Sequence, residues 1–223
     1  MKIIKAYAEI MNKVDPECID QMYQMMEKAG RTCYKSEDRI TPESARKFVA
    51  GLIKRGHEAM IEHASMTVKF VVDRGVSHEI VRHRIASFAQ ESTRYCNYSQ
   101  DKFGNEITFI QPCFWDEKDD LCVDWRSAMR IAESHYFGLL EKGATPQEAR
   151  SVLPNSLKTE LIVTMNMREW RHFFKLRAAG VTGAPHPQML EVAVPLLQRC
   201  QMLMPELFGD IVIPDEYKEK YGK

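Results

Sequence analysis

Side chains able to do chemistry concentrate in one segment of the chain, VRHRIASFAQESTRYCNYS, which runs from Val81 to Ser99. Arg82, His83 and Arg84 stand next to one another there. On a helix they fan out over roughly 200°, because each residue turns the helix by about 100°. The three side chains therefore cannot all grip one ligand, but they can serve two ligands, or one ligand and a neighbouring subunit.

The residues that follow this cationic triplet have a composition that suits a phosphate group. Guanidinium forks and backbone N–H groups match the geometry of phosphate oxygens. The same composition also fits a solvated helix end followed by a polar loop, and spacing alone favours neither reading. Amide, carboxylate, hydroxyl and guanidinium groups come in direct succession, on Gln90, Glu91, Ser92, Thr93 and Arg94.

A second group of polar residues is interleaved with apolar ones in NMREWRHFFKLR, residues 166–177. Trp170, Phe173, Phe174 and Leu176 have the spacing of a buried helix face. On pattern alone, the polar members indicate a helix with an exposed cationic face. Those members are Asn166, Arg168, His172 and Arg177. Arg150 lies in another helix, EARSVLP, and an arginine just before a proline stop is typical of a surface residue.

Metal and nucleophile motifs are weak in this sequence. His57 and His63, in GHEAMIEH, are six residues apart and point about 120° from each other on a helix. We therefore expect a structural or substrate-contact role for them and no metal site. Ser92 has no adjacent base, so a binding role is favoured over a nucleophilic one. The sequence has no GxGxxG, GxxxxGK[ST] or GxSxG motif, which argues against Rossmann, P-loop and α/β-hydrolase sites.

Length and charge narrow the class of protein. The chain has 223 residues, 44% hydrophobic and 28% charged, as in ordinary globular proteins. Lys plus Arg equals Asp plus Glu, 31 against 31, which argues against a nucleic-acid or membrane-surface partner. The cations are nevertheless clustered: residues 74–94 hold four arginines and two glutamates. The six scattered cysteines form no CxxC pair, and no signal peptide or membrane span is evident, so we expect free thiols and a cytoplasmic location.

Strands and helices alternate along the chain, with helices in the majority, and predict a single α/β or α+β domain. Period-2 patterns predict strands at residues 2–10, 65–72, 106–110 and 157–166. The first predicted helix runs from Pro16 to Ala29, with Gly30 as its C′ residue, and the second from Thr41-Pro42 to Gly56. Further helices are predicted over residues 75–84, 118–142 and 167–179, and another begins at the capping box of Thr145. A last helix is predicted over 185–208 with a kink at Pro195, and residues 87–105 are expected to form a polar irregular loop.

Taken together, these segments resemble the flavin-dependent thymidylate synthases. That family carries the motif RHR-x7-S, which stands here as Arg82-His83-Arg84, seven residues, and then Ser92. GHEAMIEHAS precedes the motif, and EARSVLP and NMREWRHFFKLR follow it. The resemblance therefore covers most of the chain, and the order and spacing of the four segments make it specific.

The resemblance implies a non-Rossmann, helix-rich α/β fold with a mixed sheet, in one domain spanning residues 1–223. It implies a homotetramer that binds FAD and shares its sites between subunits. The reaction would convert dUMP to dTMP, with methylenetetrahydrofolate as one-carbon donor and NADPH reducing the flavin. The family needs no cysteine nucleophile, so protein groups mainly position and polarise the reactants.

The resemblance also assigns roles to individual residues. Arg177 matches the residue that favours ionisation of the uracil ring at N3, and it is the expected catalytic group. His57 lies on the folate and flavin side. The dUMP contacts are matched by Glu79, Arg82, Gln90, Glu91, Ser92, Thr93, Arg94, Arg150 and Arg177. The positions lining FAD are matched by Arg82, His83, Arg84, Gln90, Asn166, Arg168 and His172.

Two other hypotheses fit parts of the sequence. A nucleotide- or RNA-binding module could use the same arginines and stack bases on Phe88, Tyr95, Tyr98 and Phe103. The neutral net charge weighs against it. A cysteine-dependent methyltransferase would need a cysteine beside a plausible base, which the sequence does not offer.

Overall fold

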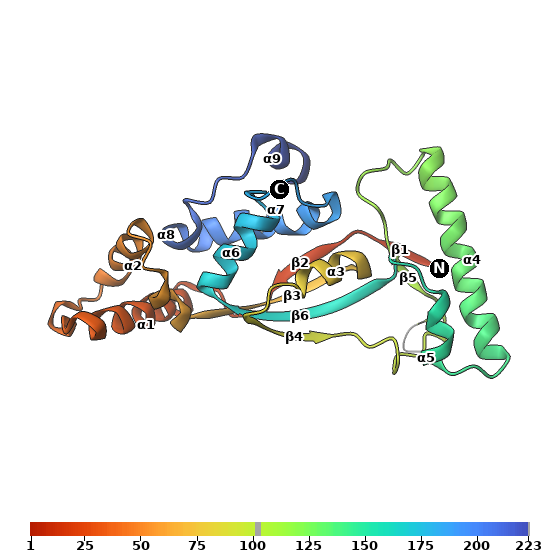
Figure 1. Ribbon diagram of the computed structural model, residues 1–223, viewed down its shortest axis with the longest axis horizontal. Coiled ribbons are helices and arrows are strands. Elements are labelled where there is room, and N and C mark those ends of the chain that lie inside the picture. Colours follow the sequence, from red (N-terminus) through yellow and green to blue (C-terminus); the bar gives the residue numbers. More distant parts are fainter. Residues whose placement is uncertain (101–103, 223) are drawn as a thin grey trace. The chain divides into compact units, whose positions relative to one another are not determined.

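A computed structural model describes residues 1–100 and 104–222, and its helices far outweigh its short strands (Figure 1). The strands are β1 (Lys2–Ile4), β2 (Tyr7–Ile10), β3 (Ser65–Asp73), β4 (Ala86–Gln90), β5 (Thr108–Ile110) and β6 (Lys158–Asn166). The α-helices are α1 (Pro16–Tyr34), α2 (Ser44–Lys54), α3 (Arg74–Ile80), α4 (Asp120–Glu141), α5 (Pro146–Ala149), α6 (Met167–Arg177), α7 (Pro187–Leu203), α8 (Pro205–Phe208) and α9 (Asp215–Tyr221). Single 3₁₀ turns are η1 (Glu37–Arg39), η2 (Glu58–His63) and η4 (Arg150–Val152).

The strands of the described residues form two small sheets. β1 pairs with β5 in parallel, with Lys2 opposite Thr108 and Ile4 opposite Ile110. The other sheet has the order β2-β3-β6-β4. In β3 the alternation that predicted the strand is real, since Met66 and Val68 are buried while Thr67 between them is not. The helix-rich α/β fold is therefore confirmed.

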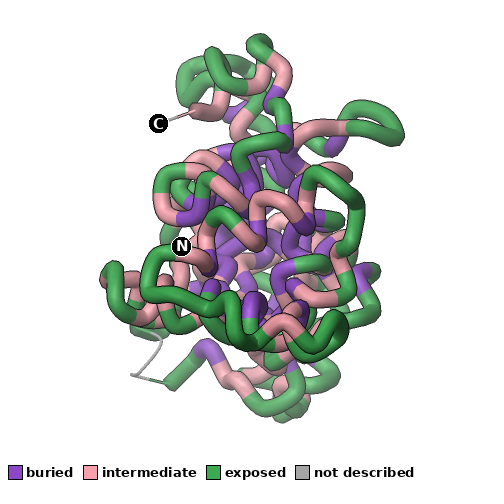
Figure 2. Tube along the Cα trace, turned by 90° about the vertical axis from the view of Figure 1, so that its left-hand side faces the viewer, coloured by how far each residue is buried: buried purple, intermediate pink, exposed green. Residues whose placement is uncertain are grey.

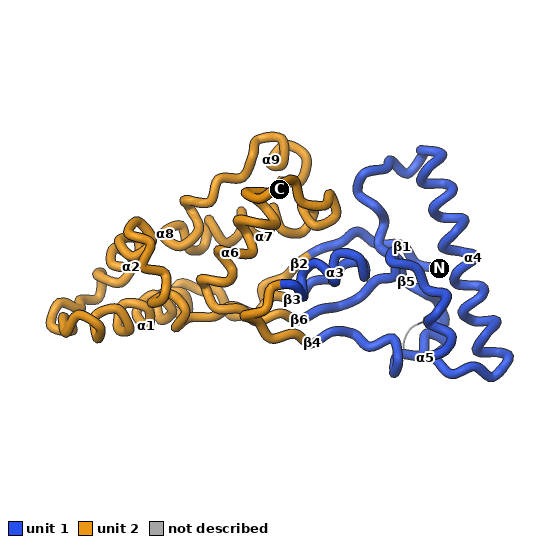
Figure 3. Tube along the Cα trace, in the orientation of Figure 1, with its two compact units in different colours: residues 1–7, 70–82, 89–161 blue, residues 8–69, 83–88, 162–223 orange. Residues whose placement is uncertain are grey.

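The chain separates into two compact units, which Figure 3 shows in different colours. Unit 1 comprises residues 1–7, 70–82 and 89–161, and unit 2 comprises residues 8–69, 83–88 and 162–223. The prediction of one domain over residues 1–223 stays a prediction. In unit 1 the core gathers around α4 and β5, with Tyr98, Ile107, Phe109, Cys122, Trp125, Met129, Tyr136, Ala149 and Leu157.

The core of unit 2 is built around α6. Trp170, Phe173 and Phe174 are fully buried and pack their rings on one another at centroid distances of 5.4 to 5.7 Å. The indole Nε1 of Trp170 donates to the carbonyl of Met66 at 2.9 Å, which ties the helix to β3. Buried and exposed positions alternate along α6 at helical spacing, so Arg168 and His172 are carried on its exposed face. Figure 2 shows the buried stretches of the whole trace in purple.

The first predicted helix is too short by five residues. Gly30 lies inside α1, and the left-handed residue that ends the helix is Lys35, with φ 48°. A Cβ on Gly30 would lie 2.5 Å from Cε1 of Phe48. The glycine is therefore required for the close approach of α2, and not for a helix cap.

Other predicted boundaries also shift. The second helix begins at Ser44 with Glu43 as N-cap, because Thr41 and Ser44 instead bond to each other in a turn: Thr41 N donates to Ser44 Oγ at 2.9 Å. The predicted irregular loop of 87–105 begins as strand β4, and its residues 101–103 lie outside the described residues, as does Phe103 of the aromatic set. The predicted last helix is divided into α7 and α8, and α9 follows it.

No helix in the described part of the chain is long and apolar enough to span a bilayer.

Candidate functional site

A cavity of about 430 Å³ in unit 2 is lined by three of the residues that the resemblance assigns to FAD, Asn166, Arg168 and His172. Asn166 is the last residue of β6, and Arg168 and His172 lie in α6. Asn166 caps that helix, since its Oδ1 accepts from the backbone N–H of Glu169 at 2.9 Å. The rest of the lining consists of residues that sequence reasoning did not select, namely Glu58, Glu62, Ile85, Glu169 and Lys175.

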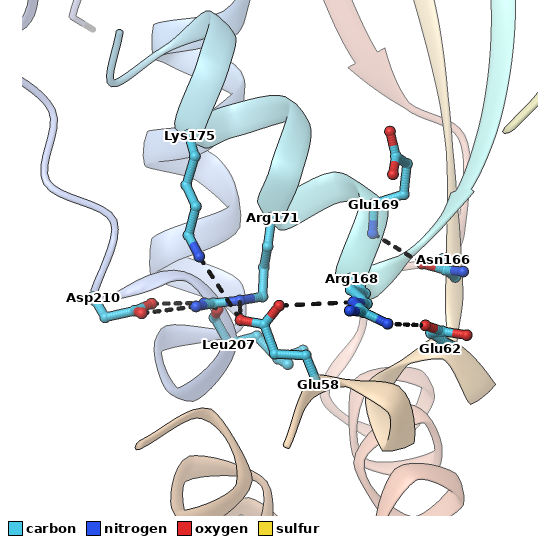
Figure 4. A network of polar contacts seen from close by, with 9 residues as sticks. All are labelled: Glu58, Glu62, Asn166, Arg168, Glu169, Arg171, Lys175, Leu207 and Asp210. Carbon is cyan, nitrogen blue, oxygen red and sulfur yellow. Dashed lines mark hydrogen bonds and ion pairs between the residues drawn. The ribbon is translucent and has the colours of Figure 1, made fainter. Parts of the chain in front are cut away.

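Carboxylates from η2 hold the cations of α6 in a network drawn in Figure 4. Arg168 Nη1 lies 2.6 Å from Glu62 Oε1 and Arg171 Nε lies 3.2 Å from Glu58 Oε1. Lys175 Nζ approaches the same Glu58 oxygen at 3.7 Å. The two glutamates belong to the GHEAMIEH segment, whose histidines rather than its carboxylates drew attention in the sequence. A basic helix face is thereby partly neutralised.

Arg171 is the most buried charge of this network, with 2% of its side chain exposed. Its guanidinium forms a bidentate pair with Asp210, at 2.6 and 2.7 Å, and donates to the carbonyl of Leu207. The hydrogen bond from Arg171 holds the pKa of Asp210 below its usual range, although burial of the carboxylate acts to raise that pKa. This residue was not among the predicted candidates, because its spacing alone does not distinguish a buried arginine from an exposed one.

His83, from the RHR motif, is almost fully buried and lies between two residues of α6. Its Nδ1 is 3.2 Å from Glu169 Oε1, and its Nε2 accepts from Arg177 Nε at 3.3 Å. Arginine has no acceptor nitrogen, so the direction of the second bond is fixed. A neutral imidazole that accepts at Nε2 carries its proton on Nδ1, and this proton then points at the Glu169 carboxylate.

Burial strongly disfavours a positive charge on the His83 imidazole. It lowers the pKa of His83 to about 4, with further contributions from Arg177 and His172. Burial also raises the pKa of Glu169. The shift of the His83 pKa leaves its imidazole neutral at physiological pH.

His83, Glu169 and His172 also place one potential ligand atom each within 4.8 Å of one another, as a metal site requires. A metal on Nδ1 of His83 would force the ring proton onto Nε2, where the Nε–H of Arg177 already points. Two donors would then face each other beside a fixed cation. The arrangement therefore favours a hydrogen-bond chain over a metal centre.

In unit 1, Gln90 and Glu91 stand at the end of β4 and are held by neighbouring side chains. Gln90 Nε2 donates to Ser77 Oγ at 3.0 Å and to Thr159 Oγ1 at 3.2 Å, and both hydroxyls belong to buried residues. Glu91 accepts from Tyr98 OH at 3.2 Å and pairs with Lys158 Nζ at 2.9 Å. Glu91, Tyr98 and Lys158 line a second cavity, of about 470 Å³. Sequence reasoning had missed Lys158.

The predicted phosphate segment of unit 1 forms a turn directly after Glu91. The carbonyl of Ser92 accepts from the backbone N–H of Cys96 at 3.0 Å, and Ser92 Oγ accepts from that of Arg94 at 3.3 Å. Arg150 Nη1 donates to Thr93 Oγ1 at 3.2 Å, although the two residues are 57 positions apart. The structure thus brings Arg150 to the predicted loop and leaves the Arg94 side chain exposed.

The remaining predicted residues belong partly to unit 1 and partly to unit 2. Glu79 is in α3, and Arg82 follows that helix as an exposed residue of unit 1. Arg84 and His57 are exposed residues of unit 2, the latter as N-cap of η2. Their assigned ligand contacts stay predictions.

The structure bears on parts of the two alternative hypotheses. In the aromatic set, Tyr95 is 79% exposed and open to a base. Tyr98 is 4% exposed and packs on Tyr136, so its ring is not available to stack on a base. Burial raises the pKa of Cys200 to about 12 and also raises that of Cys18. A nucleophilic cysteine needs the opposite shift.

Comparison with known proteins agrees with the resemblance seen in the motifs. The family model described as "Thymidylate synthase complementing protein" matches residues 17–206. Proteins named flavin-dependent thymidylate synthase from Corynebacterium efficiens and Geobacter sulfurreducens are each 32% identical to this chain. Those matches cover 85% and 82% of the chain and 79% and 78% of the relatives. A protein of the same name from Pyrococcus furiosus is 36% identical to this chain, and the match covers 66% of the chain and 60% of the relative.

The fold is also similar to that of a solved structure. The UMP/dUMP methylase PolB from Streptomyces cacaoi, bound with 5-Br dUMP, superposes with a TM-score of 0.74. The match covers 100% of this chain and 98% of the other at 24% identity, and at that identity it supports the fold alone.

Proposed function

This chain belongs to the family of flavin-dependent thymidylate synthases, and we propose that it converts dUMP to dTMP with FAD as cofactor, methylenetetrahydrofolate as one-carbon donor and NADPH as reductant. The contact between His83 and Arg177 carries the proposal. It joins the RHR motif to the last residue of NMREWRHFFKLR, two segments on which the family resemblance rests. A cytoplasmic homotetramer whose subunits share each site is part of the same proposal.

The unit 2 cavity has a donor set that fits a flavin nucleotide. The N–H groups of Arg168 and Lys175 that do not go to Glu62 or Glu58 would donate to a diphosphate, and the remaining lone pairs of the two carboxylates would accept from ribose hydroxyls. Ile85 is 69% exposed and offers an apolar surface to a flat ring. When bound, the flavin supplies the hydride that reduces the transferred one-carbon group.

The turn of Ser92 to Arg94 fits the phosphate of dUMP. Arg150 contacts Thr93 in this turn, so a second guanidinium stands beside the exposed Arg94. A phosphate carries close to two negative charges at neutral pH, and two arginines match it with bidentate hydrogen bonds.

Arg177 has the chemistry to activate the pyrimidine. A fixed cation beside N3 of uracil favours loss of the N3 proton, because an opposite charge at short range stabilises the anion. The planar guanidinium has five N–H donors, of which the one on Nε goes to His83. The bond to His83 fixes the orientation of the guanidinium plane.

The purified protein is expected to be yellow and to release FAD when it is denatured. Its absorption spectrum, chromatography of the released cofactor and dTMP formation from dUMP, methylenetetrahydrofolate and NADPH test this expectation. An RNA-binding module would instead be colourless and would bind RNA with a steep salt dependence. A colourless protein that takes up no added FAD would exclude the proposed function.

Replacing Arg94 by alanine is expected to weaken dUMP binding by about 10- to 100-fold. The substitution removes a charge-assisted contact worth about 1.5–3 kcal/mol. Titration of the flavin spectrum with dUMP measures the change. Arg130→Ala is the matched control, because Arg130 is an exposed arginine of the same unit on α4. Equal dUMP affinities of Arg94→Ala and wild type would remove Arg94 from the phosphate site.

A further inference from the structure

Glu169 is the one member of the buried chain Glu169···His83···Arg177 to which the family resemblance assigns no role. Its side chain is 11% exposed, and that of His83 is 3% exposed. Glu169 and Arg177 are eight residues apart on α6, which is roughly 12 Å along a helix axis. The imidazole of His83 contacts both, with Nδ1 toward the first and Nε2 toward the second.

The ring of His83 is also held from its sides. Phe173 and His172 contact it edge-on, at centroid distances of 5.0 and 5.6 Å. A ring flip would replace both nitrogens by carbons and break both hydrogen bonds. The position of the ring therefore follows from packing, and the two hydrogen bonds then depend only on which nitrogen carries the proton.

Arg177 can donate to His83 in only one tautomer of the neutral ring. With the proton on Nδ1, Nε2 has a lone pair for the Nε–H of Arg177. With the proton on Nε2, two N–H groups would face each other over the 3.3 Å between these nitrogens. The Glu169 carboxylate lies 3.2 Å from Nδ1. An ionised carboxylate has no proton to donate and acts only as an acceptor, so it stabilises the tautomer with the proton on Nδ1.

We propose that Glu169 is a positioning residue, whose carboxylate fixes the Nδ1–H tautomer of His83 and thereby orients the guanidinium of Arg177. This inference rests on the proposed function for its consequence in turnover, but not for its geometry. It predicts that Glu169 acts on the step that needs Arg177 and not on the binding of the nucleotide substrate. Because Glu169 also lines the unit 2 cavity, flavin affinity is not used as a readout of this role.

The tautomer can be read directly by ¹⁵N NMR of the flavin-loaded protein with labelled histidine. A protonated ring nitrogen and an unprotonated one resonate far apart, and comparison with His83→Gln identifies which signals of the seven histidines belong to His83. In the wild type, we expect the proton on Nδ1. In Glu169→Ala, we expect it to move wholly or partly to Nε2.

Turnover provides the second readout. Glu169→Ala leaves a buried donor unpaired and is expected to lower kcat about tenfold, with a dUMP affinity within about twofold of wild type. Turnover is compared at saturating FAD, because Glu169 also lines the unit 2 cavity. Glu169→Gln keeps an acceptor oxygen and is expected to restore both the Nδ1–H tautomer and most of kcat. Glu219→Ala, an exposed carboxylate of α9, is the control and is expected to match the wild type.

Three results would overturn the proposal. These are a wild-type His83 protonated on Nε2, a Glu169→Ala variant with unchanged tautomer and turnover, and a Glu169→Gln variant as impaired as Glu169→Ala. If Glu169→Ala does not fold, the wild-type and Glu169→Gln spectra still decide. A wild-type protein that makes no dTMP but shows the Nδ1–H tautomer would contradict the proposed function and leave the geometry standing.

Discussion

Arg177→Ala is expected to keep its bound flavin and to lose dTMP formation by about 10²–10³-fold, the usual effect of removing one preorganised electrostatic group. Arg177 lies at the last residue of α6, whose buried aromatic face holds the helix in place without it. The substitution should therefore remove a charge without unfolding the helix. Flavin absorbance and single-turnover dTMP formation measure the two effects separately.

Two comparison variants sharpen this test. Arg177→Lys restores a positive charge but not the planar Nε–H that reaches His83, so only part of the turnover should return. Arg199→Ala removes an exposed arginine of the same unit and should leave turnover unchanged. Near-normal dTMP formation by Arg177→Ala would contradict the assigned role.

The same substitution has a consequence for His83. Burial is the first cause of the low pKa of His83, and the positive charge of Arg177 is the second. In Arg177→Ala the pKa of His83 should therefore rise from about 4 but stay below that of an exposed histidine. Titration of its NMR signals measures the shift, and an unchanged pKa would mean that the guanidinium does not face the ring in solution.

Local sequence patterns predicted those elements whose cause is itself local. The alternation of Met66 and Val68 gave β3, and the Thr145–Glu148 capping box formed as expected, with Thr145 N donating to Glu148 Oε2 at 2.7 Å. The spacing of Trp170 and Phe173 likewise located α6. In each case the residues that decide the structure are within four positions of one another.

Features that depend on a distant partner were not predictable in this way. Gly30 reads as a helix stop, and only the ring of Phe48 from α2 shows why a glycine is needed inside α1. Arg171 was not among the polar residues that the pattern singled out on this helix, and its partner Asp210 is 39 residues away. Helical periodicity predicts which face a residue occupies, but not which charge meets it there.

The candidate site shows the same division. The residue types and their spacing alone fit a phosphate-binding loop and a solvated basic segment equally well. The family resemblance supplied the roles of the individual residues. Neither identified Glu169, because it lies 86 positions from His83 and a single glutamate among the arginines of residues 166–177 looks like ordinary compensation of charge. Its place in the chain of hydrogen bonds emerges only from the folded structure.

Arg171→Met is expected to lower the free energy of unfolding by about 3 kcal/mol, because it leaves two carboxylates without their buried partner. The bond to the Leu207 carbonyl connects α6 to α8, and the bidentate pair with Asp210 connects it to the segment after α8. The bond to Glu58 connects it to η2. Glu58 and Asp210 are 21% and 49% exposed, so water can partly solvate them in the variant. This places the expected loss at the low end for a buried pair.

Arg168→Met provides a control on the same helix. Arg168 contacts Glu62 and approaches Glu58, but its side chain is 52% exposed. A half-exposed pair contributes only about 0–1 kcal/mol. Urea unfolding of the two variants therefore distinguishes the effect of burial from the effect of the number of ion pairs. Equal losses of unfolding free energy would show that the burial of Arg171 does not contribute to stability.

The pH dependence of the Arg171→Met effect has a definite sign. Pairing with Arg171 holds the folded-state pKa of Asp210 below that of a free aspartate, so the unfolded state binds a proton at higher pH than the folded state does. The stability that the pair contributes is thus fully present above the unfolded pKa and is lost as the pH falls through the folded one. The difference between wild type and Arg171→Met should be largest near neutral pH and shrink below about pH 4. A difference that stays constant across this range would assign the stabilisation to packing of the arginine side chain and not to its charge.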